Sequence, residues 1–152
     1  MNARRWIFAA GPVAAAAGLG GLGARRAPQV YRDLRKPRWA PPAAAFGPVW
    51  SALYTGIAVA GWRLSGGASR RCRALHLVQL ALNAAWPAAF FNARDKRASL
   101  LIISLLDAAI AAEILALRRE DRLAALLLVP YLAWTGFATA LNAAVSDPGD
   151  CG

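Results

Sequence analysis

The sequence predicts an all-α integral membrane protein, a bundle of five transmembrane helices. Two features lead to this fold class. First, 58% of the 152 residues are hydrophobic and only 17% are charged, which is far from the composition of an average soluble domain. Second, the charged residues are clustered, and the stretches between clusters are each about 20 residues long, enough to cross a bilayer as a helix. These stretches lack the alternation of barrel strands, so helices are expected.

The five expected spans belong to a single membrane domain that covers residues 1–152. The connectors between them are short or rich in charge, which favours antiparallel neighbours whose turns stay in water. The expected spans are residues 6–24, 44–62, 74–93, 98–117 and 123–146.

The first span, residues 6–24, allows two interpretations. Its basic start, apolar middle and small-residue end are typical of a cleaved signal peptide. The alternative is a retained helix, which we favour because the apolar stretch is longer than that of most signals and arginines flank both of its ends. The glycines near its end would then allow close helix contact or line a cavity.

The connector 25–43 holds six basic residues and Asp33, so we expect it at the level of the lipid headgroups. Pro41 and Pro42 close this connector. Proline lacks a backbone N–H and is tolerated only in an extended entry or a first helical turn, so the pair marks the start of the second span, residues 44–62.

The third span carries a polar stripe, because Gln79, Asn83, Trp86 and Phe90 recur at helical spacing. A polar stripe does not face lipid. Either Gln79 and Asn83 hydrogen-bond neighbouring helices, or they line an internal pocket with an aromatic floor. The fifth span repeats the arrangement with Tyr131, Trp134, Ala138 and Leu141 or Asn142.

The fourth span contains two carboxylates, Asp107 and Glu113, and charge at membrane depth is costly. They lie about 120° apart around a helix and so do not form a catalytic pair on one face. We expect Glu113 to reach toward Arg118, one turn away. Asp107 is interpreted as a structural partner of a neighbouring helix, with a pocket acid as the alternative.

The net charge of +10 is spread over every connector, which favours anionic lipid headgroups over nucleic acid as the counterpart. The basic residues divide equally between the two sides, so orientation is open. Cys72 and Cys151 are expected outside the spans, on opposite sides of the membrane. His76, the only histidine, is interpreted as an interfacial residue, and no metal site is expected.

Ala81, Ala85 and Ala89 form a small-xxx-small ridge on the third span, away from its polar stripe. Small side chains let helix backbones pack closely in lipid, so this ridge is the expected dimer interface. The alternative is that alanine is merely common in this chain.

Three motifs carry a resemblance to a known family. They are "KPRWAPPAAAFGPVWSALY", "QLALNAAWPAAFFNAR" and "VPYLAWTGFATALN", and they occur in this order along the chain. Together they resemble the signatures of the TspO/MBR family, the tryptophan-rich sensory proteins and translocator proteins also described as peripheral-type benzodiazepine receptors. With the five spans, the resemblance covers nearly the whole chain.

The resemblance implies a five-helix bundle, often a homodimer, with a pocket that accepts porphyrins and other flat hydrophobic ligands. The connector 25–43 would fold back as a lid over this pocket. No cofactor is required, and a tetrapyrrole such as protoporphyrin IX or haem is the expected ligand. The ligand-binding residues implied by the motifs are Trp39, Trp50, Asn83, Trp86, Trp134, Ala138 and Leu141.

Two classes of function follow from this resemblance. The first is a membrane receptor or translocator that senses, sequesters or transports tetrapyrroles, with no catalytic residues. The alternative is an enzyme that degrades protoporphyrin in light, for which Trp50 and Trp134 would be the photochemical residues. The abundance of Ala and Arg beside only two Lys indicates GC-rich coding, and hence a bacterial cell envelope as the expected location.

Overall fold

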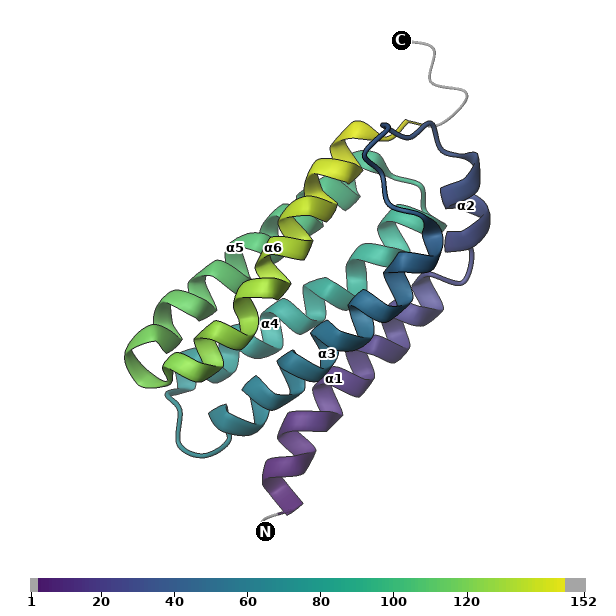
Figure 1. The fold of residues 1–152 in the computed structure, drawn as a ribbon. Helices are drawn as coiled ribbons and strands as arrows, with labels where there is room; N and C mark the ends of the chain where they lie inside the picture. Colours follow the sequence, from purple (N-terminus) through teal and green to yellow (C-terminus); the bar gives the residue numbers. More distant parts are fainter. Residues whose placement is uncertain (1–2, 147–152) are drawn as a thin grey trace.

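The computed structural model describes residues 3–146, which form a helical bundle (Figure 1). Its five long helices are long and apolar enough to cross a membrane, which confirms the predicted architecture. These helices are α1 Ala3–Gly23, α3 Phe46–Leu64, α4 Arg70–Pro87, α5 Lys96–Glu120 and α6 Arg122–Ala144. Three short elements lie between them: helix α2 Ala27–Asp33, the 3-10 turn η1 Ala43–Ala45 and the π-helical turn η2 Ala88–Asn92.

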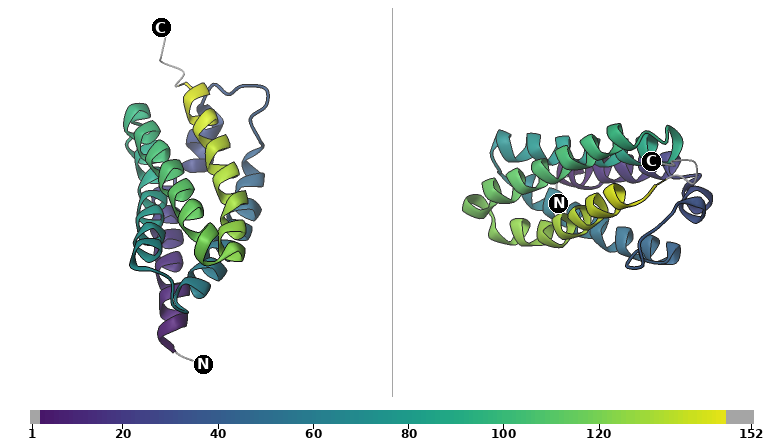
Figure 2. Two further views of the ribbon diagram at one scale, coloured as in Figure 1. Left: turned by 90° about the vertical axis from the view of Figure 1, so that its left-hand side faces the viewer. Right: turned by 90° about the horizontal axis from the view of Figure 1, so that it is seen from above.

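The long helices form a closed ring in which each helix packs mainly against two neighbours. The order around the ring is α1, α3, α6, α5, α4 and back to α1. Figure 2 shows the long helices side by side, with the start of α1 and the end of α6 at opposite ends of the bundle. Val13 and Ala16 of α1 belong to the same buried core as Ile57, Ile110 and Leu128, so α1 is an integral part of the bundle.

Residues 25–43, which we call the lid, cross one end of the bundle between α1 and α3 (Figure 1). Pro42 precedes η1 in an extended conformation, as expected for an entry to the second span. Val30 and Leu34 of the lid are buried against the end of α6. An isolated antiparallel bridge between the backbones of Arg35 and Ser146 fastens the lid there.

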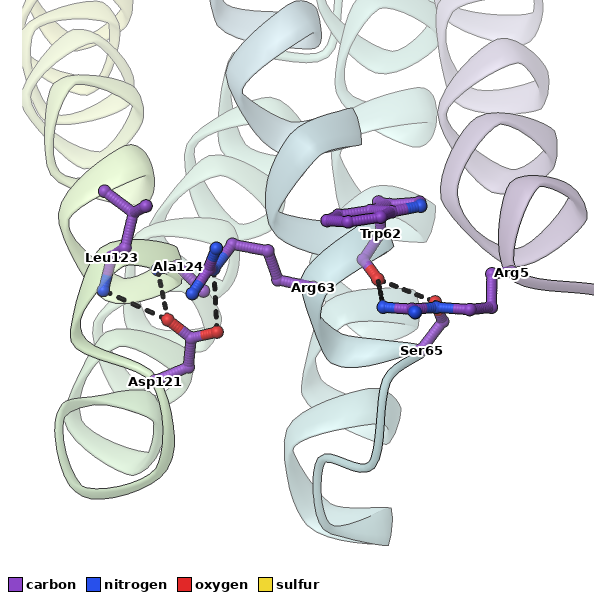
Figure 3. Close-up of polar contacts among 7 residues, drawn as sticks. All are labelled: Arg5, Trp62, Arg63, Ser65, Asp121, Leu123 and Ala124. Carbon is purple, nitrogen blue, oxygen red and sulfur yellow. Dashed lines mark hydrogen bonds and ion pairs between the residues drawn. The ribbon is translucent and has the colours of Figure 1, made fainter. Parts of the chain in front are cut away.

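Polar side chains tie the helices together at the opposite end of the bundle (Figure 3). Arg63 at the end of α3 forms an ion pair with Asp121, in which Nε lies 2.8 Å from Oδ2. Arg5 of α1 donates to the hydroxyl of Ser65 at 3.3 Å and to the carbonyl of Trp62 at 3.4 Å. The guanidinium also lies 4.5 Å from the centre of the Trp62 ring, a cation–π contact.

Asp121 has a second role, because its side chain caps the start of α6. Its Oδ1 accepts hydrogen bonds from the backbone N–H groups of Leu123 and Ala124. Partial burial raises the pKa of Asp121, but the hydrogen bond from Arg63, these backbone donors and the charge of Arg63 outweigh it. The net pKa lies below the ordinary value, so the carboxylate stays ionised at neutral pH.

Gly23 allows the close approach of α1 to the end of α4. A Cβ at this position would lie 2.8 Å from the backbone nitrogen of Ala88, a distance that real side chains do not adopt. By contrast, a Cβ at Gly18 would meet no atom within 4 Å. The structure therefore requires glycine at position 23 but would accept a larger residue at position 18.

We expect Gly23→Ala to destabilise the protein by about 1–3 kcal/mol, because the methyl group must push backbone away from backbone. Gly18→Ala, on the same helix but in open space, should leave stability unchanged or slightly improved. Unfolding of both variants in detergent micelles, followed by circular dichroism, measures the difference. Equal stability of the two variants would contradict the close contact at Gly23.

Candidate functional site

A cavity of about 360 Å³ lies at the lid end of the bundle, between α1, the lid, α3, α4 and η2. This volume is within the range of small-molecule sites in proteins. Its walls are almost entirely apolar, and none of the residues that line it carries a charge. They are Ala17, Gly20, Gly21, Ala24, Ala27, Pro28, Tyr31, Ala43, Phe46, Trp50, Tyr54, Asn83, Trp86, Pro87 and Phe91.

Two tryptophans supply broad aromatic surfaces to this cavity. Trp50 of α3 packs against Tyr54, one turn further on, with ring centres 5.5 Å apart. Trp86 of α4 stacks on Phe90 at 5.3 Å. Its indole N–H donates to Asn142 of α6 at 2.9 Å, which fixes the orientation of the ring. The cavity thus offers indole faces held in place by neighbouring helices.

A directional chain of hydrogen bonds begins at the cavity wall. The hydroxyl of Tyr54 donates to Asn83 Oδ1 at 2.7 Å, and Asn83 Nδ2 donates to the hydroxyl of Tyr131 at 3.0 Å. Tyr131 in turn donates to Gln79 Oε1 at 2.9 Å. The polar stripe of the third span therefore bonds neighbouring helices, and its member Asn83 also lines the cavity.

The lid contributes Tyr31 to the cavity wall, and the ring of Tyr31 packs edge-on against Phe46 with ring centres 5.3 Å apart. The Tyr31 hydroxyl donates to the carbonyl of Pro41 at 2.6 Å, which links α2 to the segment just before η1. Burial raises the pKa of Tyr31 above its ordinary value, so the hydroxyl remains a donor at neutral pH.

The structure brings three of the seven implied ligand-binding residues to this cavity: Trp50, Asn83 and Trp86. Trp39 and Trp134 lie outside it, and both pack against Phe137. Trp134 also meets the cavity residue Phe46 edge-on at 5.7 Å. The indole nitrogen of Trp134 is buried without a hydrogen-bond partner.

The other two implied residues belong to packed parts of α6. Ala138 is buried in the main core, and Leu141 is buried with the lid residues Val30 and Leu34. Neither lines the cavity described above. The ligand-binding role of all seven residues stays a prediction; of these, only the α3 and α4 members line this cavity.

Sequence reasoning missed several cavity residues, although some of them had a signal in the sequence. Gly20 and Gly21 belong to the glycine run of the first span, for which a cavity wall was one of two expectations. Tyr54 ends the first quoted motif and Phe91 lies near the end of the second, but neither was given a role. Tyr31 had no signal, because only the fold of the lid places it over the cavity.

Three expectations about polar residues are wrong. His76 is not interfacial but fully buried, and Glu113 does not reach toward Arg118. Instead His76 Nδ1 and Glu113 Oε1 lie 2.8 Å apart between α4 and α5. Cys72 lies inside the first turn of α4 and is buried, whereas Cys151 falls outside the described residues. Helical periodicity shows which residues of one helix share a face, but it does not show which neighbouring helix they contact. These contacts, which join α4 to α5, could therefore not be predicted from it.

Asp107 is a structural partner of a neighbouring helix, as expected. The hydroxyl of Thr139 on α6 donates to Asp107 Oδ2 at 2.7 Å, which links α5 to α6. Within residues 3–146, no three acidic, histidine or cysteine side chains gather where they could hold a metal ion. An apolar cavity whose walls are largely aromatic and hold few polar groups suits the binding of a flat hydrophobic molecule.

Comparison with known proteins agrees with the bundle. A family model described as "TspO/MBR family" matches residues 8–146. The chain is 42% identical to the human "Translocator protein" over 118 aligned residues. The aligned region covers 74% of this chain and 70% of the relative. It is 38% identical to "Tryptophan-rich protein TspO" of Chlorobaculum tepidum, over 74% of each chain. It is 34% identical to "Tryptophan-rich sensory protein" of Cereibacter sphaeroides, over 74% of this chain and 72% of the relative.

Proposed function

This chain belongs to the TspO/MBR family of multi-pass membrane proteins, and on that premise we propose that it binds tetrapyrroles and other flat hydrophobic ligands in the cavity beneath the lid. The observation that carries the proposal is the apolar cavity lined by Trp50 and Trp86. Indole rings offer wide faces for stacking on a planar macrocycle. The protein would act in sensing, sequestration or transport of such ligands.

The names of the relatives support a receptor or carrier over an enzyme, because they are those of a translocator and of sensory proteins. Protoporphyrin IX and haem are the proposed ligands. A light-dependent enzyme that degrades protoporphyrin is the second candidate. One observation favours it: Trp50, at the cavity wall, lies 5.5 Å from Tyr54 and 6.4 Å from Tyr131, ring centre to ring centre.

One experiment tests both candidates. Protoporphyrin IX is titrated into the purified protein in the dark, and the same sample is then illuminated while the absorbance of the pigment is followed. Saturable binding without pigment loss is the expected result. Trp50→Ala should weaken binding about tenfold or more, whereas Trp6→Ala, at the other end of α1, should not.

Two outcomes would change this assignment. Equal losses of affinity in the two variants would place the ligand outside the cavity. Pigment loss that needs both light and protein, and that disappears in Trp50→Phe, would favour the enzyme. Trp134→Phe serves as a second photochemical test, since this residue lies beside the cavity residue Phe46.

We also propose that the protein forms a homodimer through α4. Ala81 and Ala85 are exposed on the outer face of this helix, and Ala89 is half-buried. Leu77 and Val78 are exposed beside them, 44% and 49% respectively. This ridge faces away from the cavity residue Asn83, so a partner and a ligand would occupy different faces.

Replacing Ala81 and Ala85 together by Leu should convert the detergent-solubilised dimer to a monomer, because the larger side chains keep the backbones apart. Porphyrin affinity should be largely retained. Light scattering and chemical cross-linking measure the change. A dimer that persists in the double variant would refute this interface.

The family match and the five apolar helices support a location in a membrane, as a multi-pass protein. They do not indicate which membrane or which kind of organism. The relatives reported above include a human protein as well as bacterial ones, so they give no support to a bacterial source. The bacterial cell envelope stays a prediction from composition alone.

A further inference from the structure

His76 and Glu113 form a buried ionisable pair within the spans. Both side chains have zero exposure, and Nδ1 of the ring lies 2.8 Å from Oε1 of the carboxylate. Burying a single charge inside a membrane protein is costly, so ionisable groups at such depth occur in pairs and often mark the path of a proton or a substrate. Neither His76 nor Glu113 lines the cavity described above, so the proposed ligand site does not explain this pair.

The surroundings of the pair are mostly apolar. On the α1 side, the Phe8 ring lies 6.2 Å from the imidazole. On the α3 side the backbone approaches closely, since a Cβ at Gly61 would lie 2.9 Å from His76 Nε2. Besides His76, the charge of Glu113 acts on two further titratable groups, Cys72 of α4 and Tyr131 of α6. Beyond them, Cys72 Sγ lies 3.4 Å from Glu120 at the end of α5.

The pair lies next to the hydrogen-bond chain that begins at the cavity. Gln79, the last acceptor of that chain, follows His76 by one turn of α4 on the same face. Tyr131 connects the two features, because it bonds both Asn83 and Gln79 and interacts electrostatically with Glu113. Among the described residues no hydrogen bond joins Gln79 to the pair, because Gln79 Nε2, His76 Nε2 and Glu113 Oε2 lack partners. Charge in the cavity and charge on the pair therefore interact through space, in an interior of low dielectric constant.

The proton count of the pair follows from its geometry. A neutral ring with its proton on Nδ1 donates to Glu113 Oε1, and this state has a net charge of −1. A further proton makes the pair neutral, and a second makes it +1. The atoms free to receive these protons are His76 Nε2 and Glu113 Oε2, which are buried and have no hydrogen-bond partner. In apolar surroundings, the number of protons that the pair binds depends on any other charge nearby.

We propose that the His76–Glu113 pair is a proton-binding site that takes up a proton when an anionic ligand enters the cavity. The inference rests on the proposed function. No charged side chain lines the cavity, so a ligand with carboxylate groups finds no fixed cation in its wall. Uptake of one proton by the pair, from water onto His76 Nε2, raises the charge of the pair by one and offsets part of the negative charge of the ligand. A neutral ligand requires no such uptake.

The test counts the protons exchanged when porphyrin binds. Protoporphyrin IX and its uncharged dimethyl ester are titrated by calorimetry at one pH in two buffers that differ in ionisation enthalpy. We expect the wild-type protein to take up as much as about one proton per protoporphyrin IX and none with the ester. The uptake should be lost in His76→Gln and Glu113→Gln. It should persist in Asp107→Asn, a control on α5 whose partner is Thr139.

A second measurement needs no variant. His76 is the only histidine of the chain, so ¹⁵N-histidine labelling gives NMR signals from this ring alone. Protoporphyrin IX at fixed pH should shift the ring nitrogens toward the protonated form, and the ester should not. Binding with the same proton count in wild type and His76→Gln, or with unchanged ring signals, would overturn this inference and leave the proposed function intact. No binding of either porphyrin would overturn both.

Discussion

Gly20→Leu is expected to lower the affinity for protoporphyrin IX by more than about tenfold, which corresponds to about 1.4 kcal/mol. Gly20 is buried on α1 and lines the cavity. A Cβ there would lie 3.7 Å from the Tyr54 hydroxyl and 3.8 Å from Pro87 Cγ, which are ordinary contacts. The Cβ of a leucine therefore meets no backbone atom, and we expect its branched end to occupy volume that the ligand needs.

Gly18→Leu is the matched control, because it introduces the same side chain on the same helix at an exposed position with no atom near its Cβ. Its affinity should stay within about twofold of wild type. Fluorescence titration of both variants, with circular dichroism to check the fold, makes the comparison. Wild-type affinity in folded Gly20→Leu would mean that the ligand binds elsewhere, and the packed α6 residues Ala138 and Leu141 would become the next candidates.

Glu113→Leu is expected to destabilise the protein by about 3–5 kcal/mol, the usual cost of removing one partner from a buried pair. The change leaves His76 in the core with an imidazole N–H that has no acceptor. Both side chains have zero exposure, so water cannot supply one. Chemical unfolding in mixed micelles measures the loss of stability.

The double variant with His76→Phe and Glu113→Leu should recover most of that loss, because no polar group then lacks a partner. Asp107→Leu provides the comparison on the same helix, since Asp107 is only partly buried and bonds Thr139. It should cost less than Glu113→Leu. A Glu113→Leu variant within about 1 kcal/mol of wild type would show that the pair contributes little to folding.

The fold was predictable because lipid sets its main constraint. Backbone polar groups must be satisfied within each span, so long charge-free stretches such as residues 123–146 leave only helices, and the structure has α6 at Arg122–Ala144. The third span differs in detail. Pro87 ends the α-helix, and the chain continues as the π-helical turn Ala88–Asn92. Proline cannot supply a backbone N–H, so the hydrogen-bond pattern changes near it.

The candidate site was only partly predictable. Helical periodicity indicates which residues of one helix share a face, and it correctly grouped Gln79 with Asn83. It does not indicate which helix that face meets, so the bond between His76 and Glu113, 37 residues apart, could not be foreseen. The lid posed the same difficulty, because Tyr31 reaches the cavity through the path of the chain and not through any local pattern.

The most direct test of the cavity as the ligand site is a distance measurement with a paramagnetic ligand. Mn(III) protoporphyrin IX broadens the NMR signals of nearby methyl groups, and alanine methyl labelling places probes throughout this chain. The signals of Ala17, Ala24, Ala27 and Ala43, which line the cavity, should lose intensity and recover when excess protoporphyrin IX displaces the probe. Ala81 and Ala85 on the outer face of α4 should keep theirs. Broadening centred on Ala81 and Ala85, with the four cavity alanines unaffected, would contradict the assignment of this cavity as the tetrapyrrole site.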